Sequence, residues 1–284
     1  MRIRQQGEYK SFFTNTFKTI RLTSGIPDTP ELTDVAINDK CLAACPYCYT
    51  NALKSGKNFD HIVQKAEEIW GGLTLNDREF QIAIGGAGEP TLHPDFIPFI
   101  KKVRELEIIP NYTTNGMHLT DDILRATEEY CGGVALSWHP HIMKVFEKAA
   151  NNLKKIKTKL NFHIIIGSDE SLTHLKTLYE TYKDYVEYFV ILPYQAVGRG
   201  TNINTHENWL KCFEWISQKP FERQRQFAFG ALFYDFLLQN NVPLEMSIYN
   251  PDVYSGYRIL NHNYKIIYKS SYDLTEKNTI RNFS

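Results

Sequence analysis

Three cysteines lie within eight residues, at Cys41, Cys45 and Cys48, with three residues in the first gap and two in the second. Thiols this close together in an intracellular chain indicate a metal or cluster site rather than disulfides. Cubane iron–sulfur clusters are held by cysteine thiolates, ordinarily four of them. Three ligands therefore leave one iron open, and an open position lets a metal bind and act on another molecule. A zinc site is the alternative, and it would need a fourth ligand such as His61 or a later cysteine.

Two glycine-containing segments follow at regular intervals. Residues 85–90 read Gly-Gly-Ala-Gly-Glu-Pro, and residues 113–116 read Thr-Thr-Asn-Gly. Glycine lets a backbone approach a ligand closely, and a carboxylate such as Glu89 accepts hydrogen bonds from an ammonium group. Asn115 could orient a ligand. Plain turn chemistry is the alternative for both segments.

Three later segments also combine polar residues and glycine. The first contains Ser137, His139 and His141, and either histidine could contact a substrate or relay protons. The second runs from His163 through Ile165 and Gly167 to Glu170. Glu170 could bind a ligand, or its negative charge could simply stabilise the start of the following helix. The third is a glycine-rich turn with Arg199, which could bind an anion or lie on the surface.

Together these segments resemble the motifs of the radical S-adenosylmethionine (SAM) superfamily. The cysteines match its CxxxCxxC signature, with Tyr47 before the last cysteine, and residues 85–90 resemble its GGE(P) motif with an Ala-Gly insertion. Residues 114–116 match its TNG run. Residues 163–170 resemble GxIxGxxE, with His163 in place of the first glycine.

The resemblance implies a [4Fe–4S] cluster on the three cysteines, with SAM bound to the open iron through its methionyl amino and carboxylate groups. One electron, from flavodoxin or ferredoxin, would cleave SAM to methionine and a 5′-deoxyadenosyl radical. The residues implied in SAM binding are Gly85, Gly86, Gly88, Glu89, Asn115, Ser137, Ile165, Gly167 and Glu170. His139, His141 and Arg199 are the candidate catalytic residues.

The elements that position these residues are six alternating strand–helix units. Apolar runs predict strands at 32–37, 80–84, 108–113, 133–138, 160–166 and 186–192, each followed by a helix with apolar residues at helical spacing. Each motif follows a strand, and functional groups of parallel βα barrels gather at the carboxyl ends of strands. We expect an α/β fold, a partial (βα)6 TIM-like barrel. A doubly wound sheet is the alternative, but GxGxxG after the first strand is absent.

The flanking regions break this repeat, so we expect an N-terminal extension at 1–31, the barrel at 32–217 and an α+β cap at 218–284. The extension suggests a hairpin over the barrel base. The cap suggests a helix at 227–239, strands at 246–249, 257–260 and 264–268, and a turn at 261–263. It contains no cysteine for auxiliary clusters, so it would act as a lid. Its substrate-contact candidates, by position alone, are Glu245, Tyr249, Tyr254, Tyr257 and Arg258.

Composition narrows the function further. Lys plus Arg and Asp plus Glu both number 32, so the zero net charge gives no case for bulk nucleic-acid binding. No apolar run reaches a membrane-spanning length, and the polar start lacks a signal segment, which predicts a cytoplasmic protein. Cys131 and Cys212 are expected to be buried structural thiols.

We therefore interpret the chain as a radical SAM enzyme, with a small or nucleoside-like substrate favoured by the cysteine-free tail. A peptide- or protein-modifying enzyme, including a glycyl-radical activase, is the alternative within this class. A non-catalytic zinc or iron–sulfur module is the alternative outside it.

Overall fold

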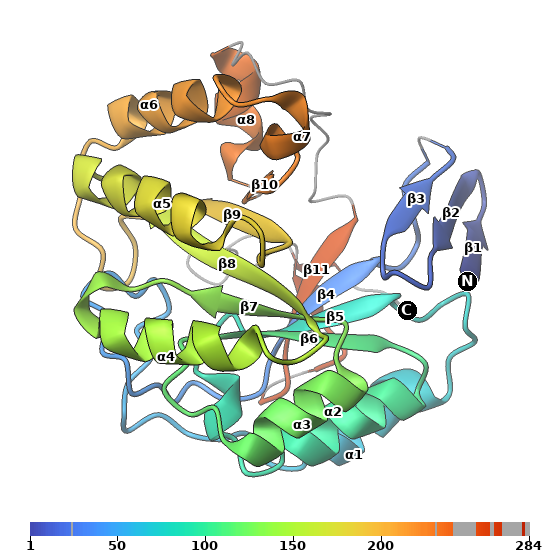
Figure 1. Ribbon diagram of the computed structural model, residues 1–284. Coiled ribbons are helices and arrows are strands. Elements are labelled where there is room, and N and C mark those ends of the chain that lie inside the picture. The colour runs from blue at the N-terminus through green and yellow to red at the C-terminus, as the bar shows by residue number, and fades with distance from the viewer. Residues whose placement is uncertain (24, 231, 241–253, 262–263, 269–279, 282–284) are drawn as a thin grey trace.

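A curled sheet with helices on its outer face forms the body of the protein (Figure 1). The computed structural model describes residues 1–23, 25–230, 232–240, 254–261, 264–268 and 280–281. Its ten-stranded sheet has the order β10-β9-β8-β7-β6-β5-β4-β11-β12-β13. The eight strands from β10 to β11 are parallel, and β12 and β13 add antiparallel pairs at one edge.

The parallel strands are β4 (Leu32–Ala36), β5 (Gln81–Ile84), β6 (Ile109–Thr114), β7 (Gly133–Ser137), β8 (Lys159–Ile166), β9 (Tyr188–Pro193), β10 (Phe227–Phe229) and β11 (Ser255–Ile259), followed by β12 (Ile267–Tyr268) and β13 (Ile280–Arg281). The helices are α1 (Ile62–Ala66), extended by a π-helical segment (Glu67–Gly71), α2 (Phe96–Glu105), α3 (Asp121–Tyr130), α4 (Met143–Leu153), α5 (Asp169–Tyr182), α6 (His206–Ser217), α7 (Phe221–Gln224) and α8 (Phe233–Gln239). Short 3₁₀ turns lie at Pro90–Leu92 and Pro140–Ile142.

Side chains of each strand alternate between two environments. In β8, Leu160, Phe162, Ile164 and Ile166 are buried, whereas the residues between them are only half-buried. Successive side chains of a strand point to opposite faces, so the buried set packs against the helices. The other set, which includes His163 and Ile165, faces the interior of the barrel, which we call the lumen.

The predicted α/β partial barrel is confirmed, and the six predicted strands begin and end within two residues of β4 to β9. Two further parallel strands join the sheet. β10 beside β9 was not predicted as a strand, whereas β11 beside β4 overlaps the strand predicted at 257–260, which was assigned to the cap instead of the barrel. The helix predicted over 227–239 was wrong at its start, because residues 227–229 form β10. Phe227 and Phe229 alternate with Ala228, and both rings pack on core aromatics, Phe227 on Phe189 and Phe229 on Phe213.

The C-terminal tail adds β11 to the barrel wall, where this strand pairs in parallel with β4. On its other side β11 pairs antiparallel with β12, and Tyr257 lies opposite Tyr268. The strand predicted at 246–249 and the turn residues 262–263 lie outside the described residues, as do Glu245 and Tyr249. The lid function of the tail remains a prediction.

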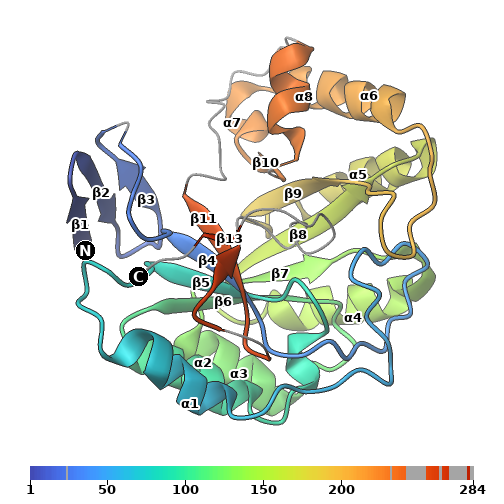
Figure 2. The same ribbon diagram turned by 180° about the vertical axis from the view of Figure 1, so that it is seen from behind.

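The N-terminal extension forms a separate antiparallel sheet of β1 (Arg2–Gln6), β2 (Tyr9–Phe13) and β3 (Thr19–Arg21) (Figure 2). Its turn between β2 and β3 contacts the starts of barrel strands. The Lys159 Nζ donates to the Thr16 carbonyl at 2.6 Å, and the Lys18 Nζ lies 3.6 Å from a Glu187 carboxylate oxygen. This turn therefore lies at the amino-terminal end of the barrel, opposite the strand ends that carry the motifs. No helix among the described residues is both long and apolar enough to span a membrane.

Candidate active site at the cysteine loop

The segment of residues 39–52, which we call the cysteine loop, leaves the carboxyl end of β4. Its ends are held together by a bridge between Lys40 and Leu53, where the Cys41 amide donates to the Leu53 carbonyl at 2.9 Å. Ala44 and Asn51 have φ of 51° and 57°, in the left-handed region that non-glycine residues rarely adopt. The loop therefore has a specific, costly conformation that the surrounding structure must maintain.

The three thiols of the cysteine loop are buried or half-buried, which affects their protonation. Burial and the nearby thiols Cys41 and Cys48 raise the pKa of Cys45 to about 12, and burial also raises the pKa of Cys41. Without a metal these groups would stay protonated at neutral pH, whereas bound iron would hold them as thiolates. In the described part of the chain, no three His, Cys, Asp or Glu side chains are arranged to hold one metal ion. The choice between a cluster and a zinc site with His61 therefore stays a prediction.

Arg199 fastens the loop from the turn after β9. Its Nε donates to the Cys45 carbonyl at 3.0 Å, its Nη1 to the Ala52 carbonyl at 3.1 Å, and its amide to the Cys48 carbonyl at 3.0 Å. The preceding Gly198 has φ 62°, and a Cβ there would lie 2.4 Å from the carbonyl oxygens of Cys48 and Tyr49. Arg199 thus fixes the main chain of the cysteine loop at three carbonyl groups.

His139 and His141 contact the same loop from the turn after β7. The Tyr47 hydroxyl lies 3.1 Å from His139 Nδ1, and His141 Nε2 donates to the Ala43 carbonyl at 2.8 Å. Burial, and the nearby His141, lower the pKa of His139 to about 4. His139 is therefore neutral at physiological pH, and its hydroxyl partner Tyr47 ties it to the cysteine loop, while its catalytic role stays a prediction.

The glycine-rich segment after β5 lies along the stretch that leads into the cysteines. The Gly88 amide donates to the Asn38 carbonyl at 3.0 Å, and a Cβ on Gly88 would lie 2.5 Å from the Lys40 carbonyl oxygen. Thr50 Oγ1 donates to the Ala87 carbonyl at 2.9 Å, and the Tyr49 hydroxyl to the Gly86 carbonyl at 3.3 Å. Glycine at position 88 is required by this close approach of the two backbones.

Glu89 is 3% exposed and its oxygens already have partners. Oε1 accepts from Thr91 Oγ1 at 2.6 Å and from Thr114 Oγ1 at 2.7 Å, while Oε2 accepts from the Asn115 amide at 2.7 Å. Burial raises its pKa and these hydrogen bonds lower it. The carboxylate therefore joins the glycine-rich segment to the Thr-Asn-Gly turn. Its predicted contact with the SAM amino group stays a prediction that must compete with this network.

Asn115 brings the turn after β6 to a cysteine, because its Nδ2 lies 3.5 Å from Cys41 Sγ. Its Oδ1 accepts from the Met117 amide at 2.9 Å, which fixes the orientation of the side-chain amide. A donor beside the sulfur stabilises its thiolate form.

The remaining predicted residues lie around the same rim of the barrel. Ser137 ends β7 on its lumen face and is paired in register with His163, two residues below Ile165 on β8. Gly167 is buried, and a Cβ there would lie 2.8 Å from the Cβ of Tyr194. Glu170 is exposed in the first turn of α5, where Ser168, not Glu170, caps the helix.

Sequence reasoning missed two polar residues of this region. Asn38 Nδ2 donates to the Glu89 carbonyl at 2.7 Å, and Asp34 lies on the lumen face of β4. For Asp34 the available signal was a polar residue inside a short apolar strand, whereas Asn38 follows that strand and gave no such signal. Cys131 and Cys212 are buried, as predicted.

The sequence model that describes the radical SAM superfamily matches residues 35–225 of this chain. No curated protein matches the sequence. Among solved structures, Streptococcus suis SuiB bound to S-adenosylmethionine is 17% identical with a TM-score of 0.66, over 90% of this chain and 63% of that chain. SuiB bound to the precursor peptide SuiA is 17% identical with a TM-score of 0.64, over 91% and 64%. The chain thus spans less than two thirds of SuiB.

A further similar structure is anSMEcpe with bound AdoMet, which is 16% identical with a TM-score of 0.58, over 85% of this chain and 74% of that chain. At these identities the solved structures show a shared fold. The match to the superfamily covers the cysteine loop and the strands whose ends contact it.

Proposed function

This chain belongs to the radical SAM superfamily, and we propose that it cleaves S-adenosylmethionine reductively at a [4Fe–4S] cluster on Cys41, Cys45 and Cys48 and abstracts hydrogen from a substrate. The observation that carries the proposal is the convergence on the cysteine loop. Groups from the ends of β5, β6, β7 and β9 all hydrogen-bond to this loop or to a cysteine sulfur.

When bound, the cluster supplies the electron that splits the SAM sulfonium into methionine and a 5′-deoxyadenosyl radical. The chain's own residues hold the three sulfur donors at fixed positions. Arg199 and His141 bond the main-chain carbonyls of the loop, which keeps its left-handed residues in place. Asn115 donates toward Cys41 and so favours the charged sulfur.

We assign SAM binding to the rim formed by the strand ends. Gly85, Gly86 and Gly88 offer backbone close to the cysteine loop, and Ser137 and Ile165 lie on the lumen faces of β7 and β8. Glu89 acts in this scheme first by holding Asn115, and its contact with the SAM amino group is secondary. Gly167 and Glu170 complete the proposed adenine side.

The proposed substrate is small or nucleoside-like. This is supported by a cavity of about 600 Å³ in the lumen, whose base contacts the N-terminal turn. A peptide substrate is the second candidate, because SuiB with the precursor peptide SuiA and anSMEcpe with the Cp18Cys peptide are similar structures that hold peptides. A glycyl-radical activase and a non-catalytic zinc or iron–sulfur module are the remaining alternatives. An external one-electron donor, flavodoxin or ferredoxin, completes the proposal.

The test is anaerobic reconstitution followed by reduction with dithionite in the presence of SAM. We expect about four irons per chain, as a cubane requires, and release of 5′-deoxyadenosine detected by liquid chromatography. Cys41→Ala, Cys45→Ala and Cys48→Ala should each abolish that release, whereas Cys212→Ala, a matched buried cysteine, should retain it. A colourless zinc protein without SAM cleavage would favour the binding-module alternative.

A further inference from the structure

Asp34 is a carboxylate on the lumen face of β4. Leu32, two residues earlier on the same face, lines the lumen cavity, while Thr33 and Val35 are buried on the opposite face. In register, Asp34 lies level with Ala83 of β5 and Tyr257 of β11. It is therefore one layer closer than Leu32 to the rim that carries the cysteine loop.

Asp34 is half-buried and, unlike the buried acids Glu31 and Glu79, has no partner among the described residues. Glu31 accepts from Tyr9 and Arg21, and Glu79 accepts from Trp70 Nε1 at 2.7 Å and Thr33 Oγ1 at 3.0 Å. Within the part of the chain that the structure describes, no hydrogen bond or ion pair reaches the Asp34 carboxylate.

Burial raises the pKa of Asp34 to about 7, and no charged group among the described residues opposes that rise. A carboxylate that loses hydration without gaining a partner costs free energy. A ligand that supplied the partner would recover part of this cost.

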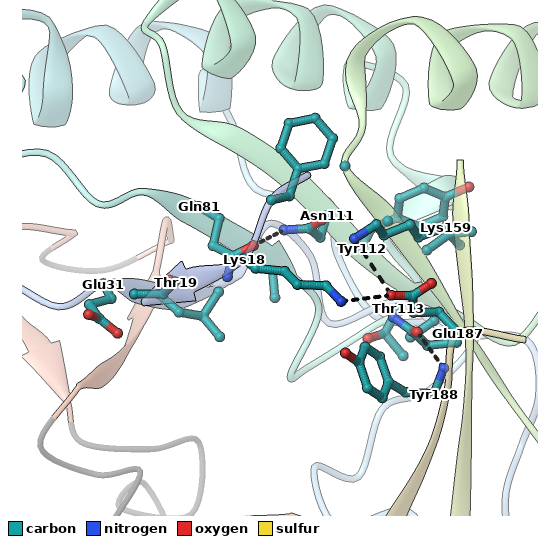
Figure 3. Close-up of a pocket in the computed structure, with 18 of the residues that line it drawn as sticks. Lys18, Thr19, Glu31, Gln81, Asn111, Tyr112, Thr113, Lys159, Glu187 and Tyr188 are labelled. Atoms are coloured by element: carbon teal, nitrogen blue, oxygen red, sulfur yellow. Dashed lines mark hydrogen bonds and ion pairs between the residues drawn. The ribbon is translucent and has the colours of Figure 1, made fainter. Parts of the chain in front are cut away.

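The cavity next to Asp34 is polar, and each cation that lines it within the described residues already pairs with another acid, Arg21 with Glu31 for example. Its middle is lined by Asn111, Asn161 and His163, and burial lowers the pKa of His163 to about 4, so this imidazole is neutral at physiological pH. The lysines of the cavity, Lys18 and Lys159, lie at its base, where both pair with Glu187 at 3.6 and 3.7 Å (Figure 3).

We propose that the lumen binds a small substrate through a positively charged nitrogen, an alkylammonium group, held by the Asp34 carboxylate. A cation from the ligand supplies the partner that the described residues do not provide, and it forms a charge-assisted hydrogen bond with the half-buried carboxylate. The polar middle of the cavity then accommodates the uncharged part of the ligand. This inference rests on the proposed function, since it names the substrate class of the same barrel.

The test uses the anaerobic holoenzyme and two probes of similar shape, n-butylammonium chloride and n-butanol. Thermal unfolding is followed with each probe and with equal NaCl. We expect the melting temperature of wild type to rise with butylammonium and not with butanol or NaCl. Asp34→Asn should lose that rise, whereas Asp60→Asn, an exposed aspartate, should keep it. Asp34→Ser replaces Asn if the latter does not fold, and Asp34→Glu should retain part of the response.

An equal rise in wild type and Asp34→Asn, an equal rise with butanol, or no rise in wild type would each overturn the inference. Release of 5′-deoxyadenosine by wild type, measured in the same samples, separates the two claims. Its presence without an Asp34-dependent shift removes only the alkylammonium assignment. Its absence alongside an Asp34-dependent shift removes the proposed function and leaves a cation site.

Discussion

At the scale of single residues, Arg199 shows how a side chain far from the cysteines in sequence fixes their geometry. Its Nε bonds the carbonyl of a residue 154 positions away, and the same guanidinium reaches a second carbonyl. Lysine can carry the charge but cannot donate in this forked geometry.

We expect Arg199→Lys to fold and to lose iron faster to a ferrous chelator. Supports of this kind typically change metal affinity by about 10-fold or more when removed. Arg125→Lys, at an exposed arginine on α3, is the matched control and should lose iron at the wild-type rate. Equal rates of iron loss for both variants would show that the Arg199 guanidinium does not hold the cysteine loop.

The Glu89 network predicts a loss of stability rather than only of SAM binding. Glu89→Ala leaves the Thr91, Thr114 and Asn115 donors without their acceptor in a buried site, at a cost of about 3 kcal/mol. Urea unfolding measures this, with Glu147→Ala on the exposed face of α4 as control. A variant as stable as the control, but defective in SAM binding, would instead assign the carboxylate to the ligand.

Asp34 predicts a pH dependence with a definite sign. Its folded pKa of about 7 exceeds the unfolded value near 3.8, so the folded chain binds the extra proton between these values. The free energy of unfolding of wild type relative to Asp34→Asn should therefore fall by about 2.5 kcal/mol from pH 5 to pH 7.5. Denaturant unfolding of both proteins across this range measures the difference, in which the other titrating groups cancel. A flat difference would contradict a carboxylate whose pKa is raised by desolvation.

At the scale of elements, the turn after β9 must come within contact of the cysteine loop, and only glycine allows this. Gly198→Ala adds a Cβ 2.4 Å from two carbonyl oxygens at a positive φ, which should destabilise the protein by about 2 kcal/mol and lower its iron content. Gly72→Ala is the matched control, because nothing lies within 4 Å of its added Cβ. Melting temperature and iron content together test this contact. A Gly198→Ala variant with the wild-type melting temperature and iron content would show that the two backbones do not approach this closely.

Predictions from sequence succeeded where the signal was local. The cysteine spacing and the apolar period of β4 to β9 lie within short stretches, so both could be identified without the fold. Residues 227–229 were assigned to a helix because a short apolar run does not distinguish helix from strand. Their pairing with β9 makes them a strand, and this long-range contact is not visible in the sequence. The partners of Arg199 and Glu89 could not be predicted, since they join residues far apart in the chain.

At the scale of the whole molecule, the two ends of the barrel carry different structural elements. The carboxyl ends of its strands carry the cysteine loop and its supports, while the amino ends meet the N-terminal turn around Lys18 and Glu187. Asp34 and His163 lie on the lumen faces of β4 and β8, between these two ends. A substrate in the lumen would contact them below the rim. The division at 31 and 217 remains a prediction.

The central claim is that three sulfur donors leave one iron of a cubane open to SAM. Electron paramagnetic resonance of the dithionite-reduced protein, recorded with and without SAM, tests it most directly. The account predicts a signal from a single [4Fe–4S]⁺ cluster whose g-values shift when SAM is added. A signal that SAM leaves unchanged, or a protein without any such signal after reconstitution, would contradict it.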